Sequence, residues 1–437
     1  MPRAGSAVDD GAGDRPHVGG GHFGGDTRNH VNCTVMTERT IYRKTAIVGI
    51  GATPYYRRGK SLPRTPVEMA CSASIAALDD AGLSVDELDG LTFYSHGSDA
   101  ALIAQTLGIA ELRFNAGITG GGGGSAGAVG LAAAAIVAGQ ANVVVTLLTL
   151  QQAFVRLGAQ YAPQEAAGVG SGVHTHVPTP ERDFCLPFGL LGPGQAFAML
   201  ARRHMHLYGT RREHFAEVAI STRANAIRRP TSLTRGPLTL DGYFSARMIA
   251  DPLCLYDFCL ESDGAVAVVT TTAERARDLK RPPVYILGCA HGGNGRWGQA
   301  ITWMNMPDDY FASSGHRPIA RRVYAEAGVG PADIDVALLY DHFTPMVIVQ
   351  LEDYGFCPIG EGGNFVADGN IRWGTGSIPV NTHGGNLSEA YLMGMTHIRE
   401  AVEQLRGTAV NQVKDAELAL VTGGPGDVPT SGMILGR

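Results

Sequence analysis

The chain has 437 residues, of which 44% are hydrophobic and 17% charged, a composition that can bury a large core. Its 35 basic and 41 acidic residues give a net charge of -6 without a basic block, which excludes a general nucleic-acid-binding surface. The seven cysteines are scattered and form no CxxC pair, which excludes a zinc ribbon and a disulfide framework and favours a reducing cytoplasm. No apolar run reaches the roughly 18 residues of a spanning helix, and no signal-peptide pattern opens the chain, so we expect neither membrane insertion nor export.

Residues 1–42 are predicted to be a disordered tail. They are rich in Gly and Asp and lack apolar periodicity. Folded structure is expected to begin with the strand TAIVGIG at 45–51, followed by an amphipathic helix over 67–80.

Two segments 246 positions apart carry the same pattern without a gap, AGLSVDELDGLTFY at 81–94 and AGVGPADIDVALLY at 327–340. Each ends a helix at Ala-Gly and runs into an apolar strand that closes on Tyr. A helix and a strand follow in the first half (131–150) and again in the second (394–424). This recurrence predicts an α/β fold made of two duplicated halves, 43–282 and 283–437, with parallel sheets between layers of helices. The stretch 152–245 has no counterpart in the second half and is predicted to be an insertion.

Five consecutive glycines, 120–124, precede an alanine-rich helical stretch. The run lacks the GK[ST] ending of a phosphate-binding loop, and its loose GxGxxG match is nearly automatic in a glycine run. Close packing or positive φ angles are a second explanation of the glycines. A third is that they expose backbone N–H groups to a bound substrate at the start of a helix.

These features resemble the thiolase superfamily, with KTAIVGIG, the glycine-rich turn, DGAVAVV at 263–269 and NTHGGNLSEA at 381–390 as the matching motifs. The likeness covers residues 43–437. Four further motifs are similar to the sterol-carrier and lipid-transfer branch, which includes bacterial steroid side-chain-cleaving aldolases: LPFGLLGPGQAFAMLARRHMHLYGT, DPLCLYDFCLESDGA, YDHFT and HGGNLSEAYLMG. The implied fold is a layered α-β-α-β-α core with an inserted loop domain.

The resemblance also shows what this chain lacks. The nucleophilic cysteine of thiolases falls at Gly122, and their second cysteine falls at Val421. Ser125 is the nearest hydroxyl, three places beyond the nucleophile position, and no base for it is identified. Cleavage of a β-hydroxyacyl-CoA needs no nucleophile, because a ketone leaves directly and only the thioester enolate requires stabilisation. We therefore expect a retro-aldol lyase that acts on a bulky CoA thioester, such as a steroid side chain, and releases a ketone and a short acyl-CoA.

The resemblance implies the site residues. Tyr340 and Tyr391 are expected to carry out proton transfer, in roles that stay open, although each alone also fits a core aromatic. His383 is assigned to the thioester oxygen. Asp341 and His342 stand where thiolases have an Asn-Glu turn. The predicted substrate-binding residues are Gly121, Gly122, Gly123, Ser125, Gly384 and Tyr256.

We expect no metal and no resident cofactor, with the CoA thioester as substrate. Similar aldolases imply a homodimer core joined by an OB-fold and zinc-ribbon partner in a heterotetramer. Two other functions fit the same motifs: an acyltransferase or thiolase with an atypical nucleophile, and a non-catalytic lipid-transfer subunit.

Overall fold

The computed structural model describes residues 41–94, 99–118, 123–153, 186–190, 192–295, 311–313, 315–426 and 429–437. They belong to one compact unit, residues 39–437. Residues 1–40 of the predicted tail, Gly121 and Gly122, and a large part of the predicted insertion lie outside the described ranges.

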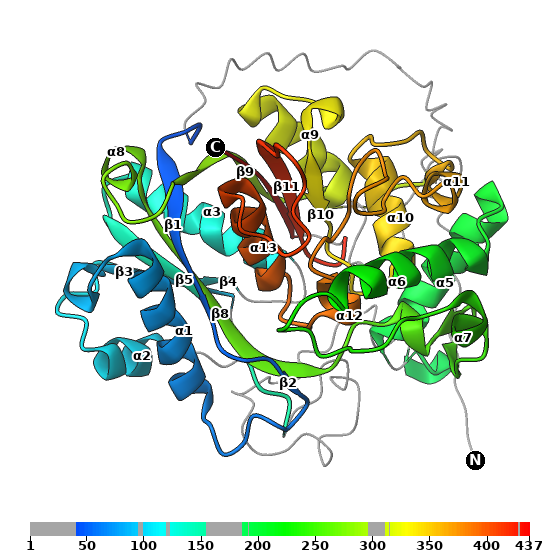
Figure 1. The fold of residues 1–437 in the computed structure, drawn as a ribbon, viewed down its shortest axis with the longest axis horizontal. Coiled ribbons are helices and arrows are strands. Elements are labelled where there is room, and N and C mark those ends of the chain that lie inside the picture. The colour runs from blue at the N-terminus through cyan, green and yellow to red at the C-terminus, as the bar shows by residue number, and fades with distance from the viewer. Residues whose placement is uncertain are drawn as a thin grey trace, which may run out of the picture. The chain divides into compact units, whose positions relative to one another are not determined.

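Strands and helices alternate through most of the unit (Figure 1). The strands are β1 (Thr45–Ala52), β2 (Tyr56–Arg57), β3 (Gly90–Tyr94), β4 (Phe114–Ile118), β5 (Val143–Leu150), β6 (Met248–Ala250), β7 (Leu253–Cys254), β8 (Ser262–Thr272), β9 (Val284–Gly292), β10 (Val336–Leu338), β11 (Leu418–Gly423) and β12 (Thr430–Gly436). The helices are α1 (Pro66–Ala81), α2 (Ala100–Leu107), α3 (Gly124–Val137), α5 (Pro193–Tyr208), α6 (Arg212–Ala226), α7 (Leu240–Phe244), α8 (Ala273–Ala276), α9 (His316–Ala327), α10 (Thr344–Asp353), α11 (Gly362–Ala367), α12 (Gly385–Ser388) and α13 (Met395–Arg406).

Local sequence explains several of these boundaries. Thr65 caps α1 by accepting a hydrogen bond from the N–H of Glu68 at 3.1 Å, and Pro66 occupies the first turn, where its missing N–H costs nothing. Gly82 ends the helix with φ 76°, a conformation that glycine adopts without strain. Every residue of β5 is buried, in keeping with its largely apolar sequence VVVTLLTL.

The main sheet has the order β10-β11-β12-β9-β1-β8-β5-β3-β4. The strands β1-β8-β5-β3 and β9-β12-β11-β10 follow the same order with the same relative directions, and the two sets meet where β1 pairs with β9. The sheet is mixed, so the prediction of parallel sheets was wrong. Strand β12 follows β11 after a short connection and pairs with it antiparallel, and β8 likewise runs antiparallel to both of its neighbours β1 and β5.

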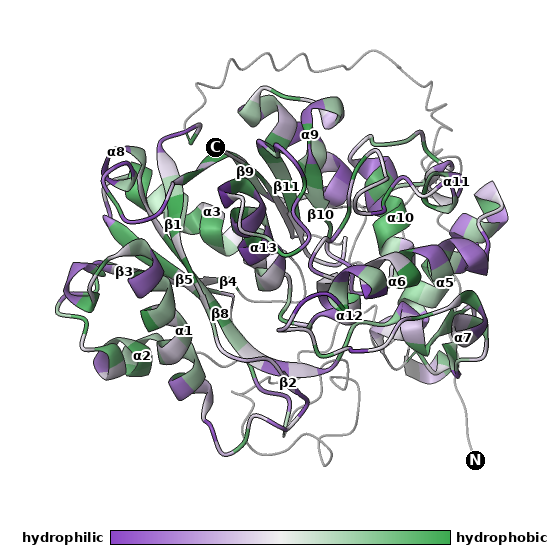
Figure 2. Cartoon of the chain, in the orientation of Figure 1, coloured by the Kyte–Doolittle hydropathy of each residue, from purple (hydrophilic) through white to green (hydrophobic). Residues whose placement is uncertain are grey.

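Helices cover both outer faces and fill the space between the two sets of strands. Helix α1 packs on β1, β5 and β8, while α9 packs on β9 and β12. Helix α3 contacts strands of both sets, and α13 contacts β8 as well as β10 and β11 (Figure 1). Buried apolar side chains of α3, α13 and both sets of strands form a central core, and Figure 2 shows β5 and α3 mostly in green. This arrangement confirms the predicted layered α-β-α-β-α fold.

The described part of the predicted insertion includes α5, α6 and α7. In sequence it belongs to the first half, yet α6 packs against α10, α11 and α12 of the second half. Its apolar side chains share one core with those helices, including Phe215, Val347 and Val366. The insertion is therefore built onto the half that carries most of the predicted site.

Candidate active site

Tyr340 lies two residues beyond the end of β10 and is held through its backbone. Its N–H donates to Thr422 Oγ1 at 2.8 Å, and its carbonyl accepts from Gln350 Nε2 at 2.9 Å. Thr422 in turn donates to Gln350 Oε1 at 2.6 Å. These buried hydrogen bonds fix the backbone of Tyr340. The orientation of its ring is then set by the side chains that pack against it.

The hydroxyl groups of Tyr340 and Tyr391 lie 3.0 Å apart. The N–H of Tyr391 donates to Ser262 Oγ at 2.9 Å, which anchors this second tyrosine to β8. Burial, and next the neighbouring Tyr391, raises the pKa of Tyr340 well above its ordinary range. Burial, and next Cys259, does the same to the pKa of Tyr391. Both tyrosines are therefore neutral at physiological pH, and the pair can share and pass a proton.

Asp341 is fully buried and holds the turn that follows His383. Its carboxylate accepts from the N–H of Asn386 at 2.8 Å and from His397 Nε2 at 3.1 Å. Gly385 has φ 62°, and a Cβ there would stand 1.9 Å from Asp341 Oδ2. A glycine is thus required for this close approach. The hydrogen bonds of Asp341 identify it as a positioning residue of the turn.

His383 and His342 are both buried. Burial, and next His397, lowers the pKa of His383 well below its ordinary value. Burial, and next His316, lowers the pKa of His342 to about 3. Both rings are therefore neutral near pH 7. The His342 ring lies 5.2 Å from the Tyr340 ring, and the His383 ring packs on His397 at 4.7 Å.

Several polar groups here have no partner among the described residues. They include the ring nitrogens of His383 and of His342, the side-chain amide of Asn386 and the hydroxyl of Ser125. Buried polar atoms are nearly always hydrogen-bonded in native proteins, so such groups in a predicted site are candidates for substrate binding. His383 and Asn386 lie on the same short turn before and within α12.

The glycine-rich segment contributes through packing where it is described. Gly123 has φ 73°, and a Cβ on it would stand 2.7 Å from the carbonyl oxygen of Pro429. A Cβ on Gly394 would stand 2.8 Å from Ser125 Oγ and 3.0 Å from the Tyr340 ring. The Ser125 hydroxyl therefore lies near Tyr340. Gly121 and Gly122 fall outside the described residues, so their predicted contacts with substrate stay predictions.

The remaining two predicted substrate-binding residues have other neighbours. Gly384 has φ 102°, and a Cβ there would stand 2.4 Å from the Cβ of Ala226, so this glycine permits α6 to pack closely. The guanidinium carbon of Arg223 lies over the ring of Tyr256, 5.5 Å from the ring centre. Arg223 also donates to Ser388 Oγ at 3.2 Å, which connects Tyr256 to the end of α12. The described contacts do not join either residue to the tyrosine pair.

Three residues near the pair, Tyr94, Cys259 and His397, were not predicted from the sequence. Tyr94 is among the groups that raise the pKa of both paired tyrosines, and it occupies the repeat position equivalent to Tyr340. This equivalence in the repeat could have identified Tyr94 as a site neighbour from the sequence. Burial raises the pKa of the Cys259 thiol. The backbone N–H of Cys259 donates to the carbonyl of His342 at 3.0 Å. No sequence pattern indicated that Cys259 lies near the pair.

The described ranges contain neither a metal-site arrangement nor a membrane-spanning helix. No group of three or more His, Cys, Asp or Glu side chains in these ranges is placed to hold a metal ion. None of the helices described combines the length and apolar character that a bilayer crossing needs. The five described cysteines are all free thiols.

The family described as thiolase C-terminal domain-like matches residues 296–437. A 17-hydroxy-3-oxo-4-pregnene-20-carboxyl-CoA lyase of Mycobacterium tuberculosis is 42% identical over 403 residues, which cover 90% of this chain and 98% of the relative. The chain belongs to the thiolase superfamily, in the branch of the steroid side-chain-cleaving aldolases. A steroid side-chain-cleaving aldolase of Thermomonospora curvata is 42% identical over 90% of this chain and 97% of its own length. The solved structure of an Ltp2-ChsH2(DUF35) aldolase has a TM-score of 0.81 at 40% identity and covers 91% of this chain and 99% of its own.

Proposed function

We propose that this protein cleaves a carbon–carbon bond of a β-hydroxyacyl-CoA by a retro-aldol reaction. The substrate is a steroid side chain or a similarly bulky CoA thioester, and the products are a ketone and a short acyl-CoA such as propionyl-CoA or acetyl-CoA. The observation that carries the proposal is the hydrogen-bonded pair of hydroxyls, 3.0 Å apart, from the buried Tyr340 and the partly buried Tyr391. Two relatives named as a lyase and an aldolase, each 42% identical, support it.

The pair can move one proton without forming a free phenolate. One tyrosine oxygen accepts the β-hydroxyl proton while its own proton passes along the hydrogen bond to the other tyrosine. The Cα–Cβ bonding electrons become the thioester enolate, and the β-carbon departs as a ketone. In the same concerted event the second tyrosine delivers its own proton to Cα as it accepts the proton of the first, so neither oxygen is left with two protons or with none. The proton balance closes, and the raised pKa of both tyrosines suits such a relay, because neither has to lose its proton to solvent.

Stabilisation of the enolate falls to neutral donors. We assign the thioester oxygen to a ring N–H of His383 and to the side-chain amide of Asn386, both buried and without a partner among the described residues. A preorganised donor in a site from which water is excluded is typically worth about 10²- to 10³-fold in rate. The lowered pKa of His383 keeps its ring neutral, so the site gains no positive charge before substrate binds.

An acyltransferase with an atypical nucleophile has less support. The Ser125 hydroxyl is buried without a base beside it among the described residues. Burial raises the pKa of Cys259, which keeps it a thiol rather than the reactive thiolate.

We propose a homodimer core with an OB-fold and zinc-ribbon partner, in keeping with the similar Ltp2-ChsH2(DUF35) aldolase, whose name joins two components. The CoA thioester enters as substrate, and no resident cofactor is needed for the chemistry above. A cytoplasmic location stays a prediction.

The test is incubation with a panel of β-hydroxyacyl-CoA thioesters, with and without an added OB-fold partner protein, while ketone and acyl-CoA release are measured. Ketone release with no acylated protein detected by intact mass spectrometry supports the lyase. An acyl adduct that forms and decays at the rate of turnover would replace it with the acyltransferase. Binding of the thioester without turnover in either mixture would favour a lipid-transfer subunit.

A further inference from the structure

Arg229 follows α6 and is buried with three carboxylates around one guanidinium. It is 3% exposed, and its Nε donates to Glu389 at 2.8 Å, its Nη1 to Glu400 at 2.6 Å and its Nη2 to Glu403 at 2.9 Å. The planar fork of arginine can satisfy three acceptors in fixed directions, which a lysine cannot do. Arg229 thus fixes the relative positions of three side chains from two segments.

Two of these carboxylates connect Arg229 to the site residues, one through the chain and one through a hydrogen bond. Glu389 stands two residues before Tyr391. Glu400 accepts a second hydrogen bond, from Thr382 Oγ1 at 2.6 Å, and Thr382 directly precedes His383. A single guanidinium therefore reaches the flank of the proton-transfer pair through one carboxylate and the flank of the thioester site through another.

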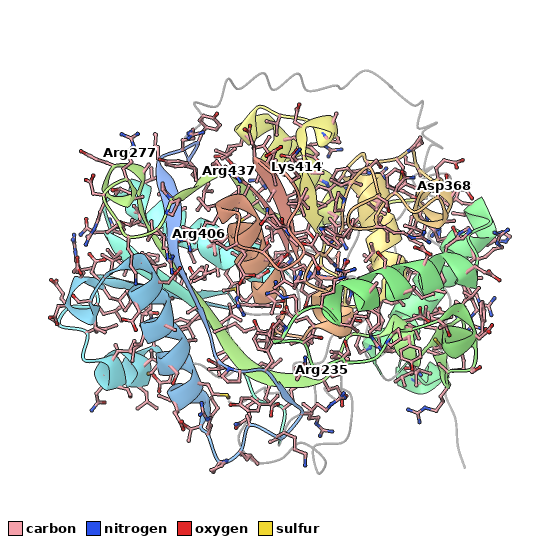
Figure 3. The ribbon with its side chains drawn as sticks, in the orientation of Figure 1. Arg235, Arg277, Asp368, Arg406, Lys414 and Arg437 are labelled. Carbon is pink, nitrogen blue, oxygen red and sulfur yellow. The ribbon has the colours of Figure 1, made fainter. Side chains whose placement is uncertain are left out.

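Arg229 belongs to segment 225–234, and other residues of this segment form hydrogen bonds to the chain between residues 381 and 391. Thr234 and Ser232 donate their hydroxyls to the carbonyl of Ser388 at 2.7 and 3.1 Å. The N–H of Leu233 donates to the carbonyl of Glu389 at 2.9 Å. At the other end, Asn225 Nδ2 donates to the carbonyl of Asn381 at 3.1 Å. Arg235, labelled in Figure 3, directly follows this segment, and its Nη2 donates to the carbonyl of Pro230 at 3.0 Å.

The charge arrangement is costly as a means of stabilisation alone. Three carboxylates face two guanidinium groups, Arg229 and Arg399, of which Arg399 donates to Glu403 at 2.9 Å. Buried ion pairs often gain little over apolar packing, because removing the charges from water offsets their attraction. What they provide is a defined geometry. Here that geometry is imposed on the chain from residue 381 to residue 391, which holds His383 and Tyr391.

We propose that Arg229, at the centre of segment 225–234, is a positioning residue that sets the separation between the thioester-binding His383 and the proton-transferring Tyr391. The inference rests on the proposed function. By it, the insertion serves catalysis by fixing the two reacting ends of the site relative to each other, without touching substrate through Arg229.

The main test is Arg229→Lys, with Arg372→Lys as the matched control. Arg372 forms a comparable fork with Glu217, at 2.6 and 2.8 Å, but is exposed, and this fork lies outside the turn 381–391. Because misplacement of a reacting group by about 1 Å costs on the order of 100-fold, we expect kcat of Arg229→Lys to fall about 10- to 100-fold. KM for the CoA thioester should stay within about threefold, since binding contacts remain. Amide hydrogen exchange should become faster in residues 381–391, and Arg372→Lys should match the wild type in all three measurements.

If Arg229→Lys fails to fold, the double variant Ser232→Ala/Thr234→Val replaces it. It removes two hydroxyl donors to Ser388 without altering a charge, and the control Thr222→Val removes a buried hydroxyl that donates within α6. The expected results are the same in direction. Unchanged kcat together with faster exchange would make the segment merely structural and overturn the proposal, as would a fall confined to KM.

A wild type that binds the thioester but releases no ketone would instead refute the proposed function. Exchange in residues 381–391, followed with and without the bound thioester, separates these two failures. It reports on the segment whether or not turnover occurs.

Discussion

Tyr94 and Tyr340 occupy the same position in the two copies of the repeat, and their surroundings differ. Tyr94 ends β3 and packs over the start of α3, where a Cβ on Gly124 would stand 1.8 Å from its ring. Tyr340 lies beyond the end of β10 and pairs with Tyr391. Duplication therefore supplies two equivalent tyrosines, and the second of them joins its hydroxyl to that of another tyrosine. The first lies near the same pair and packs its ring against Gly124.

The two glycine-rich helix starts differ in the same way. Gly124 makes room for an aromatic ring, whereas Gly385 makes room for the carboxylate of Asp341. The buried histidines described around the site, His316, His342, His383 and His397, all belong to the second half. Glycines at two helix starts thus allow the close approach of an aromatic ring in one half and of a buried carboxylate in the other.

The largest effect is expected from the tyrosine pair. Tyr340→Phe and Tyr391→Phe should each lower kcat about 10²- to 10⁴-fold, which is the usual contribution of a positioned acid or base. The Kd for the CoA thioester should stay unchanged. The double variant should be no slower than the slower single variant, because both tyrosines move one proton. Tyr324→Phe, whose hydroxyl donates to the carbonyl of Tyr354 at 3.0 Å away from the pair, is the control. Strictly multiplicative losses in the double variant would contradict a shared relay.

Matched alanine substitutions test whether the glycines at the two helix starts, Gly124 and Gly385, have different roles. Gly385→Ala should displace Asp341 and lower kcat about 10- to 100-fold, since the turn that carries His383 must shift. Gly124→Ala should instead lower the free energy of unfolding by about 1 to 3 kcal/mol through overpacking against Tyr94, with a smaller effect on kcat.

Denaturant unfolding and steady-state kinetics of both variants measure these effects. Gly236→Ala is the control, because a Cβ there meets nothing within 4 Å. Equal loss of kcat in the two variants would remove the distinction between the helix starts.

Acid should act through the histidines of the second half. Burial lowers the pKa of His316 from an ordinary 6.5 to about 3. Below pH 6.5, His316 therefore binds a proton in the unfolded chain but stays neutral in the folded protein. Stability is therefore lost as pH falls through this window, by about 1.5 kcal/mol for one such group between pH 6.5 and pH 5.

His316→Gln should reduce this acid loss by that amount, measured as the change in the free energy of unfolding between the two pH values. The exposed His206 gives the control, His206→Gln, which should leave the loss as in the wild type. An identical pH dependence of His316→Gln and wild type would show that His316 does not contribute.

The smallest effect is expected for Tyr94→Phe. Loss of the Tyr94 hydroxyl should change kcat by less than about threefold, because the ring that packs over Gly124 is retained. A loss as large as that of Tyr340→Phe would make the two repeat positions chemically equivalent.

The sequence by itself determined a good deal of this protein. The alternation of helices and strands, the repeat and the missing thiols at Gly122 and Val421 depend on local patterns and counts, so they are legible in one dimension. The same patterns predicted parallel sheets where the sheet is mixed, because periodicity specifies a strand but not the direction of its neighbour.

Only the tertiary structure decided which groups meet. The hydroxyls of Tyr340 and Tyr391 are 51 residues apart in sequence, and Arg229 lies 160 to 174 residues from its three carboxylates. Gly384, predicted from the sequence to bind substrate, lies close to Ala226 of α6, a neighbour that no sequence pattern indicated. Such contacts arise from the packing of whole helices and sheets, whose distances and directions no local pattern specifies.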